Sequence, residues 1–279
     1  MRVALALGGG GARGLAHIHV LEALDELGVE VVEVAGSSIG AVMGVGYAGG
    51  MTGRDIRDHA VGTFSNPTEV MAAFWRMRVG GSAAKATAAR LPLLAPRLVD
   101  LDAERVVRAF LPGGLPDRIE NLAIPTSVMV TEFYEQVSIA LRQGPLFHAV
   151  GASAAIPGIF CPVQDEARVL IDGGIGNPVP FDVLGETGIH HDLVVAVDVV
   201  GTPVRHTRRL PTKREQLFGA TQALMRQTTE LKIAAKAPDI LVRPPVTGVN
   251  VLDFLKVAAI LDATKGVKDE VKRQVEAAA

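Results

Sequence analysis

Residues 36–40 read Gly-Ser-Ser-Ile-Gly, and they constrain the fold more than any other stretch of this chain. A β-branched run precedes them and an apolar run follows, so the predicted local order is strand, tight turn and helix. Such a turn lifts the Ser38 hydroxyl out of the sheet toward a substrate. Side chains at Gly36 and Gly40 would collide in so sharp a bend. Hydrolysis with Ser38 as the nucleophile is therefore the first hypothesis.

The composition favours a large α/β core and argues against a nucleic-acid-binding protein. The chain has 279 residues, and 48% of them are hydrophobic but only 4% aromatic, so the core is built mainly from Ala, Val, Leu and Ile. Proteins that bind nucleic acids are usually strongly basic, whereas the net charge here is −2. The single cysteine, Cys161, cannot form an intrachain disulfide, which fits a reducing, cytoplasmic location.

Neither of the two longest uncharged windows is typical of a membrane-spanning helix. Residues 34–53 are rich in glycine, and residues 143–164 contain three prolines, whereas a span needs ~20 predominantly apolar residues. We also identify no targeting segment, because the apolar run 3–7 is too short for a signal-peptide core. Any contact with the inner face of the membrane is therefore expected to be peripheral.

Short apolar runs alternate with segments of helical periodicity along the chain. This alternation predicts a three-layer α/β/α fold with a mostly parallel central sheet. We expect residues 1–200 to form the core and residues 201–279 to form an extension packed on the same domain. The predicted strands are 3–7, 31–35, 125–131, 136–141, 169–171, 193–199 and 240–242, and the predicted helices include 14–27, 66–77, 102–111, 213–236 and one or two within 251–276.

A glycine-rich loop, residues 8–14, follows the first predicted strand. Its backbone N–H groups and the positive end of the next helix suit a phosphate or a developing oxyanion. The same G-x-G-x-x-G, Gly9 to Gly14, also fits a dinucleotide fold in which Glu33 binds the ribose. A plain strand-to-helix turn is the third interpretation, and this stretch alone does not separate the three.

A third stretch, residues 169–174, is an apolar strand that ends in Asp172, Gly173 and Gly174. An acid at the end of a strand lies at the sheet edge where loops converge. Its simpler interpretation is an aspartate that only caps the turn, which is usual for Asp-Gly.

The histidines do not supply an obvious base for Ser38. A Ser–His–Asp hydrolase needs a histidine late in the chain, and the candidates are His190, His191 and His206. None of them lies in a segment typical of an active-site loop. In addition, Ser38 follows only the second strand, earlier than in most α/β-hydrolases.

Taken together, the three stretches resemble the patatin-like phospholipase family of bacterial type. The family's G-G-G-x-R-G is present at 9–14, its nucleophile motif at 36–40 and its D-G-[GA] at 172–174, while 153–160 is similar to its proline-containing segment. The resemblance covers roughly residues 3–200.

The resemblance implies a lipid acyl-ester hydrolase with a catalytic Ser38–Asp172 dyad and no histidine. It also implies an oxyanion hole in the glycine loop. We expect no metal and no cofactor, since the histidines and the single cysteine show no metal-ligand spacing. The expected site residues are Ser38 and Asp172 as the dyad, Gly9, Gly10, Gly11 and Arg13 at the oxyanion hole, Gly36 and Gly40 at the serine turn, and Gly14, Gly173 and Gly174 as motif support.

An aspartate can serve as the base if its surroundings raise its pKa. A free aspartate, with a pKa of ~3.9, is a weak base at neutral pH. Partial desolvation raises the pKa, and a direct hydrogen bond to Ser38 removes the need for an imidazole between them.

Two basic segments bear on membrane contact. Residues 79–99 carry only basic charges among apolar residues, and they fit a mobile cover at an anionic lipid surface or a solvated loop. For the run at Arg205, Arg208, Arg209, Lys213 and Arg214, a solvated loop is favoured over a headgroup site. The competing functions are a dinucleotide-binding protein using the 9–14 loop and a catalytically silent regulator with the same fold.

Overall fold

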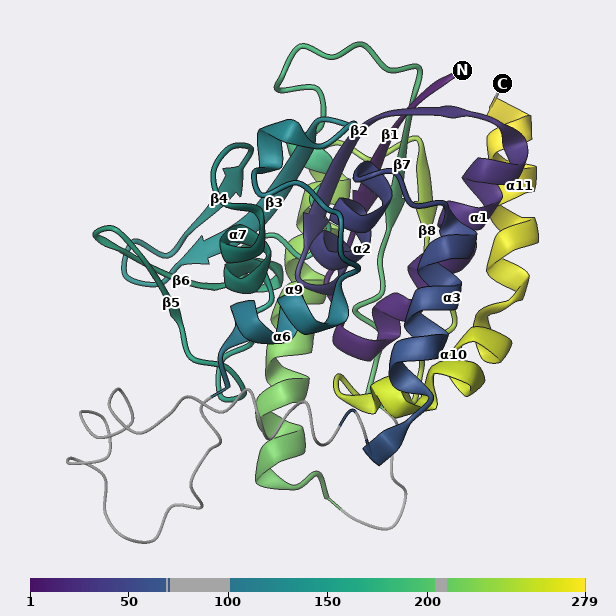
Figure 1. The fold of residues 1–279 in the computed structure, drawn as a ribbon. Coiled ribbons are helices and arrows are strands. Elements are labelled where there is room, and N and C mark those ends of the chain that lie inside the picture. The colour runs from purple at the N-terminus through teal and green to yellow at the C-terminus, as the bar shows by residue number, and fades with distance from the viewer. Residues whose placement is uncertain (69, 71–100, 204–209, 279) are drawn as a thin grey trace, which may run out of the picture.

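The computed structural model describes residues 1–68, 70, 101–203 and 210–278 (Figure 1). Within them, one sheet has the strand order β5-β6-β3-β2-β1-β7-β8, and β4 also pairs with β3. Strands β3, β2, β1, β7 and β8 are mutually parallel, and β4, β5 and β6 join antiparallel at one edge. The predicted mixed, mostly parallel sheet is confirmed. The strands are β1 Arg2–Leu7, β2 Glu30–Ser37, β3 Thr126–Glu132, β4 Val137–Leu141, β5 Val163–Asp165, β6 Arg168–Asp172, β7 Leu193–Val197 and β8 Ile240–Val242.

Helices cover both faces of this sheet. The α-helices are α1 His17–Leu27, α2 Ile39–Ala48, α3 Gly53–Phe64, α6 Ala103–Phe110, α7 Leu146–Ser153, α8 Gly173–Gly176, α9 Lys213–Ala235, α10 Val257–Thr264 and α11 Gly266–Ala278. Short 3-10 helices are η1 Gly11–Ala16, η2 Ile119–Asn121, η3 Phe181–Val183 and η4 Asp253–Lys256.

The alternation of side chains along β1 separates the two helical layers. Leu5 and Leu7 pack in a large cluster with residues of α1, α2, α3, α10 and α11. Ala6 points to the opposite face, where it clusters with Ala196 and with Ile233 of α9. Figure 1 shows α1, α3, α10 and α11 grouped on one side of the molecule, apart from the long helix α9. The sheet is therefore covered on both faces, as in the predicted three-layer fold.

The C-terminal residues complete both the sheet and one helical layer. Strand β8 adds to β7 in parallel, from Val195↔Ile240 to Val197↔Val242. Val267 and Val271 of α11 are buried in the same cluster as the residues of α1. The division at residue 200 into core and extension stays a prediction.

The segment after β1 differs from the helix predicted over 14–27. It begins as the 3-10 helix η1, and the regular α-helix starts only at His17. Gly14 lets η1 and the start of α2 approach each other closely, because a Cβ there would lie 2.3 Å from Cγ2 of Ile39.

Helices α3 and α7 were not predicted from the sequence, whereas α6 begins after the predicted cap, Asp102, whose side chain accepts from the Arg105 N–H. The possible cover at 79–99, most of the helix predicted at 66–77, and Arg205, Arg208 and Arg209 lie outside the described residues. Among the described residues, no helix combines the length and apolarity needed to cross a bilayer.

Candidate active site

Ser38 occupies the turn between β2 and α2 in a backbone conformation that side chains rarely adopt. Its φ of 54° and ψ of −122° match the first central position of a type II′ turn, which normally favours glycine. Such a residue stores strain of about 1–3 kcal/mol, and the surrounding packing must hold it. A Cβ at Gly36 would lie 2.6 Å from Ala41 N, and one at Gly40 would lie 2.0 Å from Leu7 O. The two glycines are therefore required at their predicted places.

The structure brings Ser38 and Asp172 into direct contact. Ser38 Oγ donates to Asp172 Oδ2 at 2.6 Å, and both side chains are buried. The second carboxylate oxygen, Oδ1, accepts from the Gly174 N–H at 2.7 Å. The aspartate therefore caps its turn, as the simpler interpretation expected, while it also contacts the serine.

Strand β3 sets the distance between these two side chains. Its Met129 pairs with Ser37 on β2, and its next residue, Val130, pairs with Asp172 on β6. Gly173 allows β6 to turn away directly after the aspartate, since a Cβ at Gly173 would lie 2.0 Å from Met129 O. Adjacent residues of one strand thus hold the two halves of the site.

Burial makes Asp172 a stronger base than a free aspartate. Desolvation raises its pKa from 3.8 to about 6, and the hydrogen bonds from Ser38 and Gly174 oppose that rise. Within the described residues, no cation forms an ion pair with this carboxylate. The carboxyl is ionised at neutral pH but takes up a proton more readily than a solvated one.

The peptide groups of the glycine loop differ in what they bind. The Gly8 carbonyl lies 2.9 Å from His17 Nε2, and the Gly9 N–H donates to the Pro178 carbonyl at 2.9 Å. Within the described residues, the N–H groups of Gly10 and Gly11 have no acceptor. Of the N–H groups from Gly8 to Gly11, these two are available to a ligand in the part of the chain that the structure describes. The grouping of Gly9 with the oxyanion-hole donors is therefore corrected, because its N–H is already donated.

Gly9 instead provides room beside the serine. A Cβ at this position would lie 3.3 Å from the Cβ of Ser38 and 3.5 Å from the Cα of Gly174. The loop therefore passes closely over both motifs, as their shared presence in the sequence led us to expect.

Arg13 braces the glycine loop from inside the protein. Its Nε donates to the Gly10 carbonyl at 3.0 Å, and its Nη1 donates to the Val200 carbonyl. Burial lowers the pKa of this guanidinium to about 10, and the nearby Asp198 carboxylate limits the fall, so Arg13 stays charged at neutral pH. Its side chain is thus committed to the loop. Its contribution to an oxyanion hole, expected from the resemblance, is therefore through the position of the loop.

Three supporting residues were missed by the sequence analysis. Ser153, at the end of α7, accepts the Ser38 N–H on its Oγ at 2.9 Å. Ala155 accepts the Asp172 N–H at 3.1 Å, and Thr131 Oγ1 donates to the Asp172 carbonyl at 2.9 Å. Ser153 and Ala155 lie in the segment 153–160 that carried part of the resemblance, which was the one available signal.

The histidines near the active-site loops contact groups other than Ser38 and Asp172. His17 is buried beneath the glycine loop, and desolvation lowers its pKa to about 4, so it is neutral and its Nε2–H is the donor to Gly8. His59 Nε2 contacts the Phe110 carbonyl at 2.7 Å. His190 and His191 lie before β7, and His206 lies outside the described residues. Among the described histidines, none hydrogen-bonds to Ser38 or Asp172.

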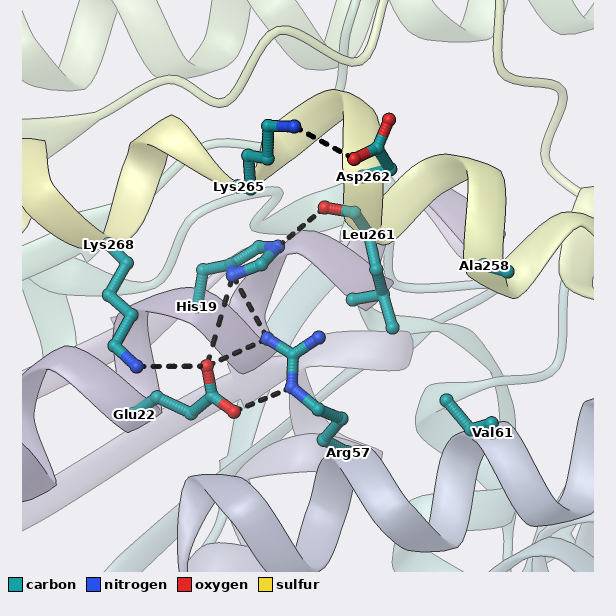
Figure 2. A pocket seen from close by; sticks show the side chains of 9 residues that line it. All are labelled: His19, Glu22, Arg57, Val61, Ala258, Leu261, Asp262, Lys265 and Lys268. Atoms are coloured by element: carbon teal, nitrogen blue, oxygen red, sulfur yellow. Dashed lines mark hydrogen bonds and ion pairs between the residues drawn. The ribbon is translucent and has the colours of Figure 1, made fainter.

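His19 belongs to a separate polar pocket between α1, α3 and α10, shown in Figure 2. Its Nε2 contacts the Leu261 carbonyl at 2.9 Å, and its Nδ1 lies 3.1 Å from Nη2 of Arg57. Arg57 in turn binds both carboxylate oxygens of Glu22, at 2.6 and 2.7 Å. Each polar group drawn there has a structural partner, so the pocket ties the helices together.

Glu33 does not lie where a ribose ligand would be needed. It pairs with Ala4, well before the end of β1 where the glycine loop begins. Its carboxylate accepts from the Gly185 N–H at 2.8 Å and from Thr187 Oγ1 at 3.0 Å. This arrangement removes the acidic partner that the dinucleotide interpretation required.

An apolar pocket opens directly onto the serine. Gly11 and Ser38 both lie in its wall, so the glycine loop and the serine turn border one space. The remaining described lining is almost entirely aliphatic or aromatic, and includes Ile39, Val42, Met43, Phe64, Val107, Phe110, Ile156, Phe160, Leu252 and Phe254. Such a lining suits a hydrocarbon chain rather than a nucleotide.

Comparison with known proteins agrees with this geometry. The family profile described as Patatin-like phospholipase matches residues 5–184, which is more than half of the chain. This chain belongs to the patatin-like phospholipase family. An uncharacterized NTE family protein of Mycobacterium tuberculosis (strain ATCC 25618 / H37Rv) is 37% identical over 72% of this chain and 50% of its own length.

Other relatives are much longer than this chain. A patatin-like phospholipase domain-containing protein of Caenorhabditis elegans is 32% identical over 71% of this chain but 13% of its own length. The lysophospholipase nte1 of Aspergillus fumigatus is 27% identical over 91% of this chain and 17% of its own length. The chain thus spans half or less of these curated relatives.

A solved structure shares the fold. VipD from Legionella pneumophila superposes with a TM-score of 0.50 at 15% identity, covering 99% of this chain and 66% of that one. At this identity the likeness concerns the fold alone.

Proposed function

We propose that this patatin-like protein is a serine acyl-ester hydrolase that acts on lipid esters of phospholipid or lysophospholipid type. The observation that carries the proposal is the buried hydrogen bond of 2.6 Å from Ser38 Oγ to Asp172, at the wall of an apolar pocket. The family name and the name of the Aspergillus relative support a lipid substrate.

In the proposed first step, Ser38 Oγ attacks the ester carbonyl carbon while its proton passes to Asp172 Oδ2. The carbonyl oxygen becomes an oxyanion and accepts from the N–H groups of Gly10 and Gly11, which have no acceptor within the described part of the protein. The tetrahedral intermediate collapses, the bond to the alcohol oxygen breaks, and Asp172 returns the proton to that oxygen.

In the second step, water hydrolyses the acyl-enzyme. Asp172 takes a proton from the water as it attacks the Ser38 ester, and the proton then returns to Ser38 Oγ as the fatty acid leaves. A carboxyl pKa of about 6 suits both directions of transfer, because it lies close to the neutral pH at which the group must accept and release a proton.

The apolar pocket supports an acyl chain as the part of the substrate that is buried. Phe110 and Phe254 are among its lining residues, together with aliphatic side chains from α2 and α3. Burial of each methylene contributes about 0.8 kcal/mol, so a long chain would be held far more tightly than a short one.

Fluorophosphonate labelling followed by peptide mapping tests the nucleophile, and a panel of acyl esters tests the substrate. We expect the label on Ser38 and no label in Ser38→Ala. Ser37→Ala is the matched control, because Ser37 Oγ donates to the Asn177 carbonyl at 2.5 Å rather than facing the base. Label on another serine, or activity that survives Asp172→Asn but depends on His190 or His191, would contradict the proposed dyad.

A further inference from the structure

The apolar pocket beside Ser38 follows one face of helix α2. Its lining includes Ile39, Val42, Met43 and Gly46 of this helix. Residues spaced three, four and seven apart lie on the same face of an α-helix, so these four residues form one stripe. Ser38 is the residue just before the helix, and the stripe starts beside it. The pocket therefore leads from the serine turn toward the C-terminal end of α2.

Helix α3 forms a second wall of the pocket and runs in the opposite direction. Ile56, near its start, has its Cδ1 3.9 Å from the position of a Cβ at Gly46. Phe64, its last residue, stacks on Phe254 of η4 with the ring centroids 5.1 Å apart. The helix η4 packs against η1, which continues the glycine loop. Phe64 thus lies at the serine end of the pocket, and Ile56 lies at the far end.

Large apolar side chains close the far end of the pocket. Sδ of Met51, in the connection between α2 and α3, lies 3.5 Å from the position of a Cβ at Gly46, beside Ile56. Both side chains line the pocket, and Gly46 is the lining residue of α2 farthest from Ser38. A methyl group at Gly46 would make ordinary contacts, whereas a larger side chain would need space that the pocket now provides. The stripe on α2 therefore ends against Met51 and Ile56.

The lining offers few polar groups away from the serine. Ser38 and the backbone of Gly11 lie at the serine end. Among the described lining residues, His59 is the only other one with a polar side chain, and its Nε2 contacts the Phe110 carbonyl at 2.7 Å. A charged headgroup placed along α2 would lose its hydration without gaining a partner. The part of a substrate that follows this stripe must therefore be hydrocarbon.

The stripe on α2 sets the length of hydrocarbon that the pocket can bury. Gly46 comes eight residues after Ser38, and an α-helix rises about 1.5 Å per residue, so the two residues are about 12 Å apart along the helix axis. An extended hydrocarbon chain advances about 1.25 Å per carbon, since its C–C bonds of about 1.5 Å form a zigzag. A chain of about ten carbons therefore reaches from the serine to Met51 and Ile56.

We propose that Gly46, Met51 and Ile56 limit the buried acyl chain to about ten carbons and so determine the chain-length preference of the enzyme. The proposal rests on the proposed function, because it places the acyl group of the Ser38 ester in this pocket. Each methylene is removed from water until the chain meets Met51 and Ile56. A longer chain must leave its end outside the pocket or displace these side chains, which close packing opposes.

Hydrolysis of p-nitrophenyl esters, kept below the concentration at which they aggregate, tests this limit. The acyl chains should range from about four to about fourteen carbons, so that they span the proposed length. We expect kcat/KM to rise about two- to fourfold with each methylene up to about ten carbons, because each one is buried, and then to level off or fall. A kcat/KM that kept rising by the same factor beyond that length would overturn the proposal.

Gly46→Val and Met51→Ala should shift this chain-length profile in opposite directions. The valine occupies the far end, so the ratio of kcat/KM for the decanoyl ester to that for the butanoyl ester should fall about tenfold. Met51→Ala removes atoms from the same place, and the longest preferred chain should gain about two carbons. Gly62→Val is the matched control and should leave the profile unchanged, because a Cβ at Gly62 of α3 meets nothing within 4 Å and this residue is not part of the lining.

A general fold defect cannot produce opposite shifts in two variants. Unchanged profiles in both variants, or shifts in the same direction, would therefore overturn the proposal. Met51→Ala only removes atoms, so it remains a test if Gly46→Val fails to fold.

Failure of the length limit and failure of the enzyme activity are separable. Reaction of Ser38 with esters at a rate that does not depend on chain length would overturn the limit and leave the proposed function standing. If Ser38 reacts with no ester, the rise in Tm caused by n-alcohols of increasing length tests the pocket alone. A rise that continues up to decanol and is lost in Gly46→Val would refute the proposed function and retain the length limit. A Tm that does not depend on alcohol length would overturn both.

Discussion

Asp172 and Glu22 are both buried carboxylates, but the protein surrounds them in opposite ways. Glu22 is held by a two-point contact with Arg57, and Lys268 lies 3.6 Å away, so the pKa of Glu22 is lowered, chiefly by the hydrogen bond from Arg57. Asp172 receives hydrogen bonds from a hydroxyl and a backbone N–H, and its pKa is raised to about 6. One carboxylate is fixed in its charged form, and the other is poised to change its protonation.

This difference teaches how to separate a structural carboxylate from a reactive one. In the cluster around Glu22, each polar side chain that Figure 2 draws has a hydrogen-bond or ion-pair partner. These contacts connect neighbouring helices. The site around Asp172 leaves two donors, the N–H groups of Gly10 and Gly11, without acceptors in the described residues. Unsatisfied donors beside an uncompensated base indicate a place for a ligand.

The largest expected effect comes from converting each carboxylate to its amide. Asp172→Asn removes the proposed base, and we expect kcat for ester hydrolysis to fall about 10⁴-fold. Glu22→Gln should leave kcat within about twofold, because Glu22 touches neither Ser38 nor the glycine loop. Steady-state kinetics on a soluble ester measure both. A comparable loss of kcat in the two variants would contradict the different roles of the two carboxylates.

The next effect concerns Arg13, which holds the peptide group between Gly10 and Gly11 through the Gly10 carbonyl. Arg13→Gln should allow the Gly11 N–H to turn away from the oxyanion, and we expect kcat to fall about 10²-fold with little change in KM. Arg13→Lys should recover part of the loss. A change confined to KM would instead indicate that Arg13 contacts the substrate.

The pH dependence of kcat/KM should also distinguish the two carboxylates, although its effect is smaller than the loss of kcat in the variants above. Because the proposed mechanism requires ionised Asp172, kcat/KM should level off above pH 6 and fall about tenfold for each pH unit below it. Glu22→Gln should leave this profile unchanged. A midpoint that stayed near 4 would mean that Asp172 is better solvated than its burial implies.

The smallest effect is on stability, where the two substitutions should have opposite signs. Above pH 6, the raised pKa of Asp172 destabilises the fold, since folded protein holds the proton to higher pH than unfolded protein does. Asp172→Asn should then raise the free energy of unfolding at pH 8 by about 2 kcal/mol. Glu22→Gln should lower it by about 1–2 kcal/mol, because Arg57 loses its partner.

Urea denaturation of both variants at pH 8 and pH 4 measures this contrast. The gain from Asp172→Asn should shrink as the pH falls through 6 toward 4, where the wild-type carboxyl is protonated in the folded state. The lowered pKa of Glu22 has the opposite sign, so its contribution is present at neutral pH and is lost in acid. Two losses of equal size at pH 8 would contradict a raised pKa of Asp172 in the folded protein.

The local parts of the site were predictable because the residues of each motif indicate the turn that the motif forms. Gly36 and Gly40 are needed because a Cβ at either position would collide with backbone atoms around the serine turn. Gly173 is needed because a Cβ there would collide with the backbone of the neighbouring strand β3. The strands around these motifs were also found, because apolar runs bounded by glycines mark buried strands.

The remaining parts depend on contacts that no local pattern contains. Ser153 reaches Ser38 across 115 residues of chain, and nothing around it distinguishes a supporting serine from a surface one. Helix α7 is eight residues long, and its Gly151 packs against Glu104 of α6, so packing rather than periodicity holds it. Helix α3 was predictable in principle, because Thr52 and Asp55 form a capping box at its start.

The pairing of β3 with both β2 and β6 has a consequence for folding. Ser38 meets its proposed base only when Val130 pairs with Asp172, and we expect this contact between distant parts of the chain to form late compared with local helices. An incompletely folded chain would thus carry an inert serine, and the hydroxyl would become reactive when the antiparallel edge closes. The rate at which a refolding sample acquires fluorophosphonate reactivity would time the closure of that edge, so the enzyme would report on its own assembly.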